Sequence, residues 1–220
     1  MDMAEVETQN LWKKHLGVVP DEVWNRSSLR VLILANNELA EISSKIGDLQ
    51  NLCTLDVGHN QLLKIPEELG SIRKLRDFLY LHDNRLESLP ASLDQLQNLR
   101  YLNISENRFA ALPRCICSMA SLVELRATDN QLSELPDCIG NLSALRELHL
   151  RNNGLRTLPP AIAKLSELRQ IDLRGNPIEL LPDALLSLPK LEKLDLRWVN
   201  TLSPPAWFNT LEDRGCLIYR

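Results

Sequence analysis

The chain has 220 residues, of which 44% are hydrophobic and 25% charged, and its formal net charge is −4. This acidic balance argues against a general affinity for nucleic acid, which needs a basic patch or stripe. No apolar run approaches the ~20 residues of a membrane-spanning helix. The first residues, MDMAEVETQN, do not resemble a secretory signal, so a cytoplasmic location is expected, with effector-type export as the alternative.

Residues 1–28 are expected to cap the N-terminal end of the fold. The stretch 5–16, EVETQNLWKKHL, predicts a short helix that brings Val6, Leu11 and Trp12 near the core. Trp24 is expected to help Trp12 close that end of the core. Residues 16–28 repeat an apolar spacing found 23 residues later and predict the rear half of an incomplete unit; the matching pairs are Leu16 with Leu39, Val19 with Ile42, and Val23 with Ile46.

From residue 29 to 196 one pattern recurs in about eight units, L-x-x-L-x-L-x-x-N-x-L-x-x-L-P-x-x-I-x-x-L. The L-x-L alternation predicts a short strand with its leucines facing the core. The asparagine is expected to satisfy backbone groups of neighbouring units. Proline then stops helix formation, and the I-x-x-L spacing suits a helical turn. The units begin at Leu29, Leu52, Leu75, Leu99, Leu122, Leu145, Leu168 and Leu191, in steps of 23 residues with a single step of 24.

These leucines, asparagines and Leu-Pro pairs resemble the leucine-rich repeat family over roughly residues 29–196, and the 23-residue unit is similar to its Ras-suppressor-like class. The resemblance implies an α/β fold, a curved right-handed horseshoe. Its concave side would carry a parallel sheet and its convex side short helical or extended segments. The resemblance also implies one single domain that binds other proteins.

The step of 24 residues lies between Leu75 and Leu99, where LRDFLYLHDNRL is one residue longer than the equivalent LRYLNISENRF. A one-residue shift within a strand would turn every following side chain to the other face, so a local bulge is the favoured solution. Such a bulge would turn Asp77 or Phe78 outward beside Tyr80. Burial of Phe78 in place of a leucine is the alternative.

Residues 197–220 depart from the repeat and are expected to form a C-terminal cap. The prolines Pro204 and Pro205 favour the start of a helix, and Gly215 its end. Leu217 and Tyr219 alternate as in a final strand.

Five cysteines with no metal-ligand spacing fit a reducing compartment and free structural thiols. The alternative is a disulfide between Cys115 and Cys138, which lie one unit apart. His59 and His82 lie in adjacent units but have no third ligand of matching spacing, so no metal site is expected. Glu124 and Glu147 are expected to be neighbours in a surface column rather than an acid/base pair.

Side chains between the core leucines face outward and are the candidates for binding. The residue between the second and third leucines predicts a central column of Ile33, Asp56, Tyr80, Asn103, Arg126, His149, Asp172 and Asp195. In the column after the third leucine, Arg151, Arg174 and Arg197 follow one another at ~4.8 Å per unit. They form either a docking strip for carboxylates or phosphates, or a strip neutralised by Asp172 and Asp195. The candidate partner-binding residues are Tyr80, His82, Tyr101, Asn103, Arg126, His149, Arg151, Asp172, Arg174 and Arg197.

The sequence contains no phosphate-binding glycine loop, metal-ligand cluster or nucleophile elbow. We therefore expect a non-enzymatic protein–protein interaction module that binds a protein partner on its concave sheet face. We expect no cofactor, no binding of nucleic acid or membranes, and a monomer. The alternative is a recruiting part for a separately encoded enzyme, for example a secreted bacterial effector that acts on host signalling.

Overall fold

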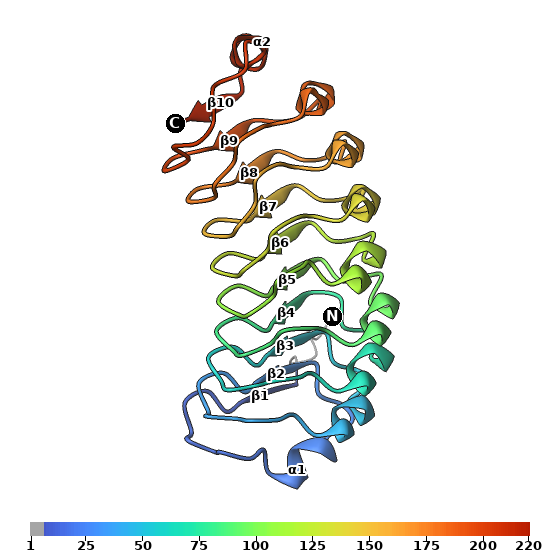
Figure 1. The fold of residues 1–220 in the computed structure, drawn as a ribbon. Coiled ribbons are helices and arrows are strands. Elements are labelled where there is room, and N and C mark those ends of the chain that lie inside the picture. Colours follow the sequence, from blue (N-terminus) through green and yellow to red (C-terminus); the bar gives the residue numbers. More distant parts are fainter. Residues whose placement is uncertain (1–6) are drawn as a thin grey trace.

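The computed structural model describes residues 7–220 and shows short strands stacked side by side along the molecule (Figure 1). They form one sheet in which neighbouring strands are parallel and follow their order in the chain. The strands are β1 (Thr8–Asn10), β2 (Val31–Ile33), β3 (Thr54–Asp56), β4 (Phe78–Tyr80), β5 (Tyr101–Asn103), β6 (Glu124–Arg126), β7 (Glu147–His149), β8 (Gln170–Asp172), β9 (Lys193–Asp195) and β10 (Leu217–Tyr219).

Short helices lie on the side of the repeats away from the strands (Figure 1). The 3₁₀ helices are η1 (Ser44–Asp48), η2 (Glu67–Ser71), η3 (Ala91–Gln95), η4 (Arg114–Ser118), η5 (Asp137–Asn141), η6 (Pro160–Lys164) and η7 (Asp183–Ser187), and the α-helices are α1 (Asp21–Trp24) and α2 (Phe208–Asp213). Within residues 7–220, no helix combines the length and the apolar character needed to cross a membrane. A parallel sheet on one side and short helices on the other confirm the predicted α/β solenoid.

One repeat shows how the sequence builds the unit. In β7, Leu148 is buried between the outward-facing Glu147 and His149, as the alternation of a strand requires. The chain then runs to Pro159, whose φ of −69° and ψ of 146° are extended and set the start of η6. Ile162 in η6 returns to the core with no exposed surface. Each unit thus buries apolar side chains that only its neighbours cover.

The asparagine of each unit connects neighbouring units through its side-chain amide. Asn107 Nδ2 donates to the carbonyl oxygens of Leu81, Ile104 and Ser105 at 3.0, 3.2 and 3.0 Å. Its Oδ1 accepts from the backbone N–H of Leu86 in the preceding unit at 2.9 Å. The predicted ladder of asparagines is therefore confirmed. It comprises Asn37, Asn60, Asn84, Asn107, Asn130, Asn153 and Asn176.

The residue before each ladder asparagine lies in the left-handed region of backbone conformation. This sharp turn reverses the chain after the strand, and Asn, Asp and Gly adopt it at the lowest cost. The residues with positive φ at this position are Asn36, His59, Asp83, Glu106, Asp129, Asn152 and Gly175, and Trp198 occupies the same position in the last unit. The turn fixes the direction in which the side chains on either side of it point.

The N-terminal segment differs from the prediction, because the expected helix over residues 5–16 is wrong. Residues 8–10 form β1, which pairs in parallel with β2 and covers the edge that the sheet would otherwise leave open. Leu11 is partly buried against the core, but Trp12 is 54% exposed and does not close it. Trp24 in α1 is buried at that end, as predicted. Val6 lies outside the described residues.

The C-terminal segment contains the predicted helix and strand. Helix α2 buries Phe208 and Leu211, and β10 pairs with β9 so that the last sheet edge is extended. At the other end, Val19 and Val23 are buried with the first repeat. We retain as a proposal that residues 1–28 and 197–220 cap the repeats of residues 29–196 within one single domain.

The cysteines correct two expectations. Cys138 is disulfide-bonded to Cys117, with a Cα–Cα distance of 5.6 Å, and not to Cys115. The partner in η4 thus lies two residues away from the position that exact repetition predicts. Cys53, Cys115 and Cys216 are buried free thiols, and burial raises the pKa of Cys115 to about 11. The expectation of free thiols therefore holds for these three cysteines only.

Candidate functional site

The register of the sheet aligns the outward side chains in the predicted columns. In the central column, Tyr80 lies beside Asp56 and Asn103, and His149 beside Arg126 and Asp172. A second column, on the other side of the buried leucines, contains Val31, Thr54, Phe78, Tyr101, Glu124, Glu147, Gln170 and Lys193. Of the ten candidate residues, six lie on the strands, and His82, Arg151, Arg174 and Arg197 follow two residues after a strand end.

An aromatic cluster of Phe78, Tyr80 and Tyr101 lies in the middle of this face. Phe78 stacks on Tyr80 at a centroid distance of 5.9 Å, and Tyr101 lies 5.5 Å from Phe78 and 5.0 Å from Tyr80. Phe78 is 43% exposed. The alternative prediction, in which Phe78 is buried in place of a leucine, is therefore wrong. A recess of about 260 Å³ adjoins the cluster, lined by Asp77, Phe78, Arg100, Tyr101, Val123 and Glu124.

The extra residue of the 24-residue step produces this cluster. It is absorbed before β4, where Arg76 and Asp77 together lie opposite Arg100, and the N–H of Arg100 donates to the carbonyl of Arg76 at 2.9 Å. The pairing of Phe78 with Thr54 and Tyr101 is unbroken, so no bulge interrupts the strand itself. Phe78 was not among the candidate residues, because the sequence left its two orientations open.

The two tyrosines of the aromatic cluster are neutral at pH 7, and burial raises their pKa further above that pH. Burial raises the pKa of Tyr101 to about 12. Burial also raises the pKa of Tyr80, and the negative charge of Asp56 adds to this effect. The rings therefore present apolar faces with neutral hydroxyl groups, a combination that suits protein interfaces.

His82 extends the aromatic surface toward the turn side of the sheet. Its ring lies 6.0 Å from Tyr80 and 4.7 Å from His59, and a side chain on Gly58 would collide with it. His82 Nε2 lies 3.2 Å from His59 Nε2, and His59 Nδ1 lies 2.6 Å from Asp83 Oδ2. Burial lowers the pKa of His82, and the neighbouring His59 lowers it further.

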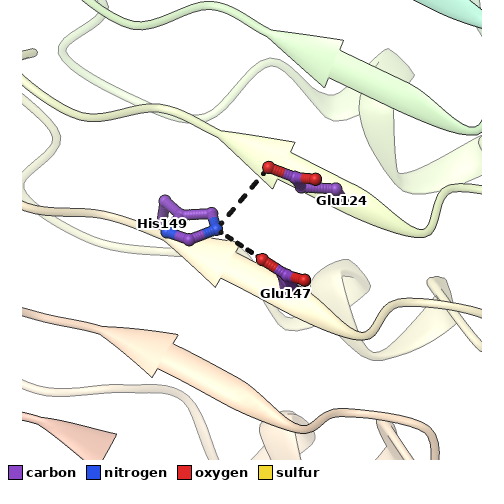
Figure 2. Close-up of side chains that lie close together, drawn as sticks. All are labelled: Glu124, Glu147 and His149. Carbon is purple, nitrogen blue, oxygen red and sulfur yellow. Dashed lines mark hydrogen bonds and ion pairs between the residues drawn. The ribbon is translucent and has the colours of Figure 1, made fainter.

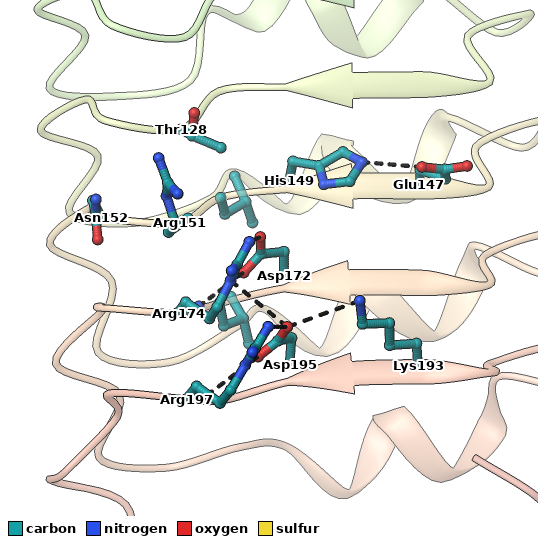
Figure 3. A network of polar contacts seen from close by, with 12 residues as sticks. Thr128, Glu147, His149, Arg151, Asn152, Asp172, Arg174, Lys193, Asp195 and Arg197 are labelled. Carbon is teal, nitrogen blue, oxygen red and sulfur yellow. Dashed lines mark hydrogen bonds and ion pairs between the residues drawn. The ribbon is translucent and has the colours of Figure 1, made fainter. Parts of the chain in front are cut away.

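A third column, directly after the third leucine of each unit, contains Arg151, Arg174 and Arg197, and all three are paired with carboxylates. Figure 3 shows the pairs of Arg174 and Arg197. Arg174 donates to Asp172 from Nε and Nη2 at 2.9 and 2.6 Å, and Arg197 donates to Asp195 at 3.0 and 2.8 Å. Arg151 Nη2 donates to an oxygen of Asp129 at 2.9 Å. These contacts correspond to the self-neutralised strip, one of the two predicted alternatives.

Asp195 is the most buried carboxylate of this network, with a side chain that is 1% exposed. Burial alone would raise the pKa of Asp195. Hydrogen bonds from Arg197 and the charge of Arg174 outweigh that effect, so the pKa lies below its ordinary value. A cleft of about 250 Å³ beside this network is lined by Arg126, Thr128, His149, Arg151, Gln170, Ile171, Asp172, Arg174 and Lys193.

Glu124, Glu147 and His149 form a third group on this face (Figure 2). His149 Nε2 lies 3.1 Å from Glu147 Oε2 and 3.7 Å from Glu124 Oε1, and one ligand atom from each residue lies within 4.8 Å of the others. Such spacing suits a metal ion, but Arg126 Nε already donates to the same Glu124 oxygen at 2.5 Å. We interpret the group as an ion-pair cluster. His149 was a candidate residue, but its two carboxylate neighbours were expected only as a surface column.

Comparison with known proteins identifies repeats over most of the chain. The family model "Leucine-rich repeat region" matches residues 67–153, "Leucine rich repeat" matches 143–202, and "Leucine Rich Repeat" matches 51–72. Among the curated proteins, none matches this chain significantly.

Several solved structures are similar to this chain. A leucine-rich repeat protein of Leptospira interrogans is 28% identical, with a TM-score of 0.53, over 92% of this chain and 63% of that chain. The leucine-rich repeat domain of the type III effector XopL is 26% identical, with a TM-score of 0.82, over 99% of this chain and 76% of that domain. The plant peptide hormone receptor RGFR1, solved in complex with RGF2, is 33% identical, with a TM-score of 0.73, over 82% of this chain and 30% of the receptor chain.

This chain thus spans less than two thirds of the Leptospira protein and less than one third of the receptor chain. The three matching models all describe leucine-rich repeats, and together they extend over residues 51–202. The chain belongs to the leucine-rich repeat family.

Proposed function

We propose that the chain is a non-enzymatic interaction module that docks a protein partner on the outward face of its sheet, acts as a monomer and needs no cofactor. The observation that carries this proposal is the aromatic cluster of Phe78, Tyr80 and Tyr101. Similarity to a peptide hormone receptor solved with its peptide supports a protein or peptide as the kind of partner. Acidic net charge argues against nucleic acid or an anionic membrane as the principal ligand.

The aromatic cluster combines the properties of an energetic centre of an interface. Its rings lie on paired strands of one sheet, so little conformational entropy is lost when a partner packs against them. Aromatic side chains are enriched among the residues that dominate binding free energy. The recess of about 260 Å³ beside Phe78 and Tyr101 offers space for one apolar side chain of the partner.

The arginines and carboxylates of the same face contribute differently. Arg174 and Arg197 already hold bidentate partners, so a ligand gains little from them unless it displaces Asp172 or Asp195. Their fixed positions instead favour correctly oriented partners and exclude others through like-charge repulsion. We therefore place the main binding energy on the aromatic cluster and orientation on Asn103, Arg126, His149 and the arginines of the third column.

The experiment is affinity capture from the source cells with the purified chain and a double variant, Phe78→Ala with Tyr80→Ala. The matched control is Leu63→Ala with Leu180→Ala, which removes exposed apolar side chains, 62% and 65% exposed, that lie outside the strands. The proposal predicts that the aromatic variant loses the partner captured by the wild type while the control keeps it. Equal recovery of the same partner by all three proteins contradicts the proposal.

A second candidate function is recruitment of a target for an enzyme encoded separately, as in an effector that acts on host signalling. The similarity to the leucine-rich repeat domain of a type III effector over 99% of this chain favours it. Both functions use the same docking face. They are separated by the identity of the captured partner, because recruitment predicts a complex with an enzyme or with its substrate. A partner from the chain's own cell with neither role contradicts the recruitment function.

A further inference from the structure

A basic groove runs along the edge of the solenoid where the chain enters the strands. Its cations are Arg30, Arg73, Lys74, Arg76 and Arg100, all of which are exposed. Two open recesses of about 860 and 440 Å³ adjoin each other there and share Lys74 and Arg76 in their linings. Uncharged hydrogen-bonding side chains along the groove are Ser28, Asn51, Asn98 and Ser121.

Within residues 7–220, the charges of this basic groove are only partly neutralised. Among the residues that line the two recesses, Asp77 is the single carboxylate, and it lies 3.9 Å from Arg76 Nε. Within residues 7–220, Arg30, Arg73 and Arg100 make no ion pair, and Lys74 Nζ donates to the neutral amide of Asn51. An excess of four positive charges therefore remains in a chain whose net charge is −4.

The same edge is neutralised farther along the solenoid. Lys190 Nζ lies 2.6 Å from Glu167, and Arg169 is ion-paired with Glu192. Arg169 occupies the position of Arg76 and Arg100 in a later unit, directly after the first core leucine. Within residues 7–220, Arg146 has the same position and makes no ion pair either, so the counter-charges at Arg169 and Lys190 distinguish the last units of this edge from the basic groove.

The basic groove is continuous with the aromatic cluster. Asp77 and Arg100 line both the larger recess of the groove and the recess beside Phe78 and Tyr101. The extra residue of the 24-residue step lies in this connection, since it precedes β4 at Arg76 and Asp77. A single extended segment that leaves the aromatic cluster at this edge enters the groove directly.

We infer that the basic groove binds an extended Asp/Glu-rich segment of the protein partner, next to the part that packs on the aromatic cluster. This inference rests on the proposed function and names the chemistry of its partner. Arg30 and Arg100 lie three repeats apart, which is ~14 Å at ~4.8 Å per strand. An extended peptide covers that length with about four or five residues, at ~3.3 Å each.

The spread of the cations favours several carboxylates over a single phosphate group. Charge complementarity over this length steers an acidic segment to the groove and aligns it. Nucleic acid is disfavoured because no aromatic ring lines the two recesses of the groove to stack a base. The groove therefore adds charge selectivity to the aromatic cluster.

The test uses fluorescence anisotropy of a labelled octapeptide of alternating Glu and Asp, with a Gln/Asn octapeptide as the neutral probe. The groove variant is Arg76→Glu with Arg100→Glu. The control is Arg169→Glu with Lys190→Glu, which makes the same change in net charge on the same edge, and circular dichroism melts verify the folding of both. Affinity of the acidic probe for the wild type is expected to fall steeply with salt. It should drop at least tenfold, equivalent to about 1.4 kcal/mol, in the groove variant and less than twofold in the control.

The inference is overturned if the wild type does not distinguish the acidic from the neutral octapeptide, or if both charge variants lose the same affinity. It is also overturned if a twelve-nucleotide single-stranded RNA or anionic phosphatidylserine vesicles bind as tightly as the acidic probe. The variant Phe78→Ala with Tyr80→Ala separates this inference from the proposed function. It is expected to retain octapeptide binding while losing the cellular partner. Octapeptide binding thus tests the basic groove, and capture of the cellular partner tests docking on the aromatic cluster.

Discussion

Replacing Asn107 by alanine tests the ladder that holds neighbouring repeats together. The substitution removes one bond accepted from the N–H of Leu86 and three bonds donated to the carbonyls of Leu81, Ile104 and Ser105. Each of these carbonyls keeps another donor, namely the amide of Asn84, the amide of Asn130 and the N–H of Asp83. The N–H of Leu86, in a residue with no exposed surface, loses its partner.

The magnitude of the effect follows from this inventory. A buried N–H without a partner costs about 1–3 kcal/mol, and the weakened acceptors add about 1 kcal/mol, so the free energy of unfolding should fall by about 2–4 kcal/mol. At roughly 2–4 °C per kcal/mol for a chain of this size, the melting temperature should fall by about 4–16 °C.

Urea denaturation and thermal melts followed by circular dichroism measure the change. The control is Asn141→Ala, because Asn141 is exposed and its side chain makes no hydrogen bond within residues 7–220. Its effect should stay within about 0.5 kcal/mol. If Asn107→Ala is no more destabilising than Asn141→Ala, the ladder does not stabilise the solenoid as described.

Two further predictions concern the buried charge and the disulfide. Because the folded pKa of Asp195 lies below its ordinary value of 3.8, its stabilisation is present above that pH and is lost as the pH falls through the folded pKa. Asp195→Asn should therefore cost about 1–3 kcal/mol at pH 7 and progressively less as the pH falls below 3.8 through the folded pKa. Melting curves from pH 7 downward check it, and a cost that does not change with pH would refute it. The Cys117–Cys138 bond closes a loop with a sequence separation of 21 residues, so reduction should lower stability by about 3 kcal/mol. Dithiothreitol should lower the melting temperature of the wild type but not of Cys117→Ala, and equal melts with and without reductant would contradict the assignment.

The period of the sequence was sufficient to predict the strands, the register and the outward columns. Each unit repeats the same buried leucines, and a strand with one buried face permits a single register. The pairing of Tyr80 with Asn103 and of Arg126 with His149 follows from this constraint. The finer assignment to the Ras-suppressor-like class is still a prediction.

Where the period ends, local patterns were a weaker guide. Residues 5–16 have an apolar spacing that fits a helix, but the open edge of β2 offers backbone hydrogen bonds that a strand alone can use. The disulfide partner of Cys138 was also missed, because repetition places Cys115 opposite it, whereas the structure bonds Cys138 to Cys117. Tertiary packing decided both cases.

Two signals in the sequence would have sharpened the site. In the tripeptides Asp172-Leu-Arg174 and Asp195-Leu-Arg197, the aspartate and the arginine are two residues apart. Both side chains therefore lie on the same side of the extended chain, where they form an ion pair. The residues before the ladder asparagines are mostly Asn, Asp, Gly and His, which indicates the left-handed turn seen there. The outward turn of Phe78 had no such signal, since it depends on where the extra residue is absorbed.

The most direct test of the central claim is site-specific photo-crosslinking to the captured partner. A photoreactive phenylalanine analogue is placed at Phe78 on the sheet or at Lys164, an exposed residue of η6 on the opposite side. Docking on the sheet face predicts a covalent product from position 78 and none from position 164. A product from position 164 alone would show that the partner binds the helical side and would contradict the account.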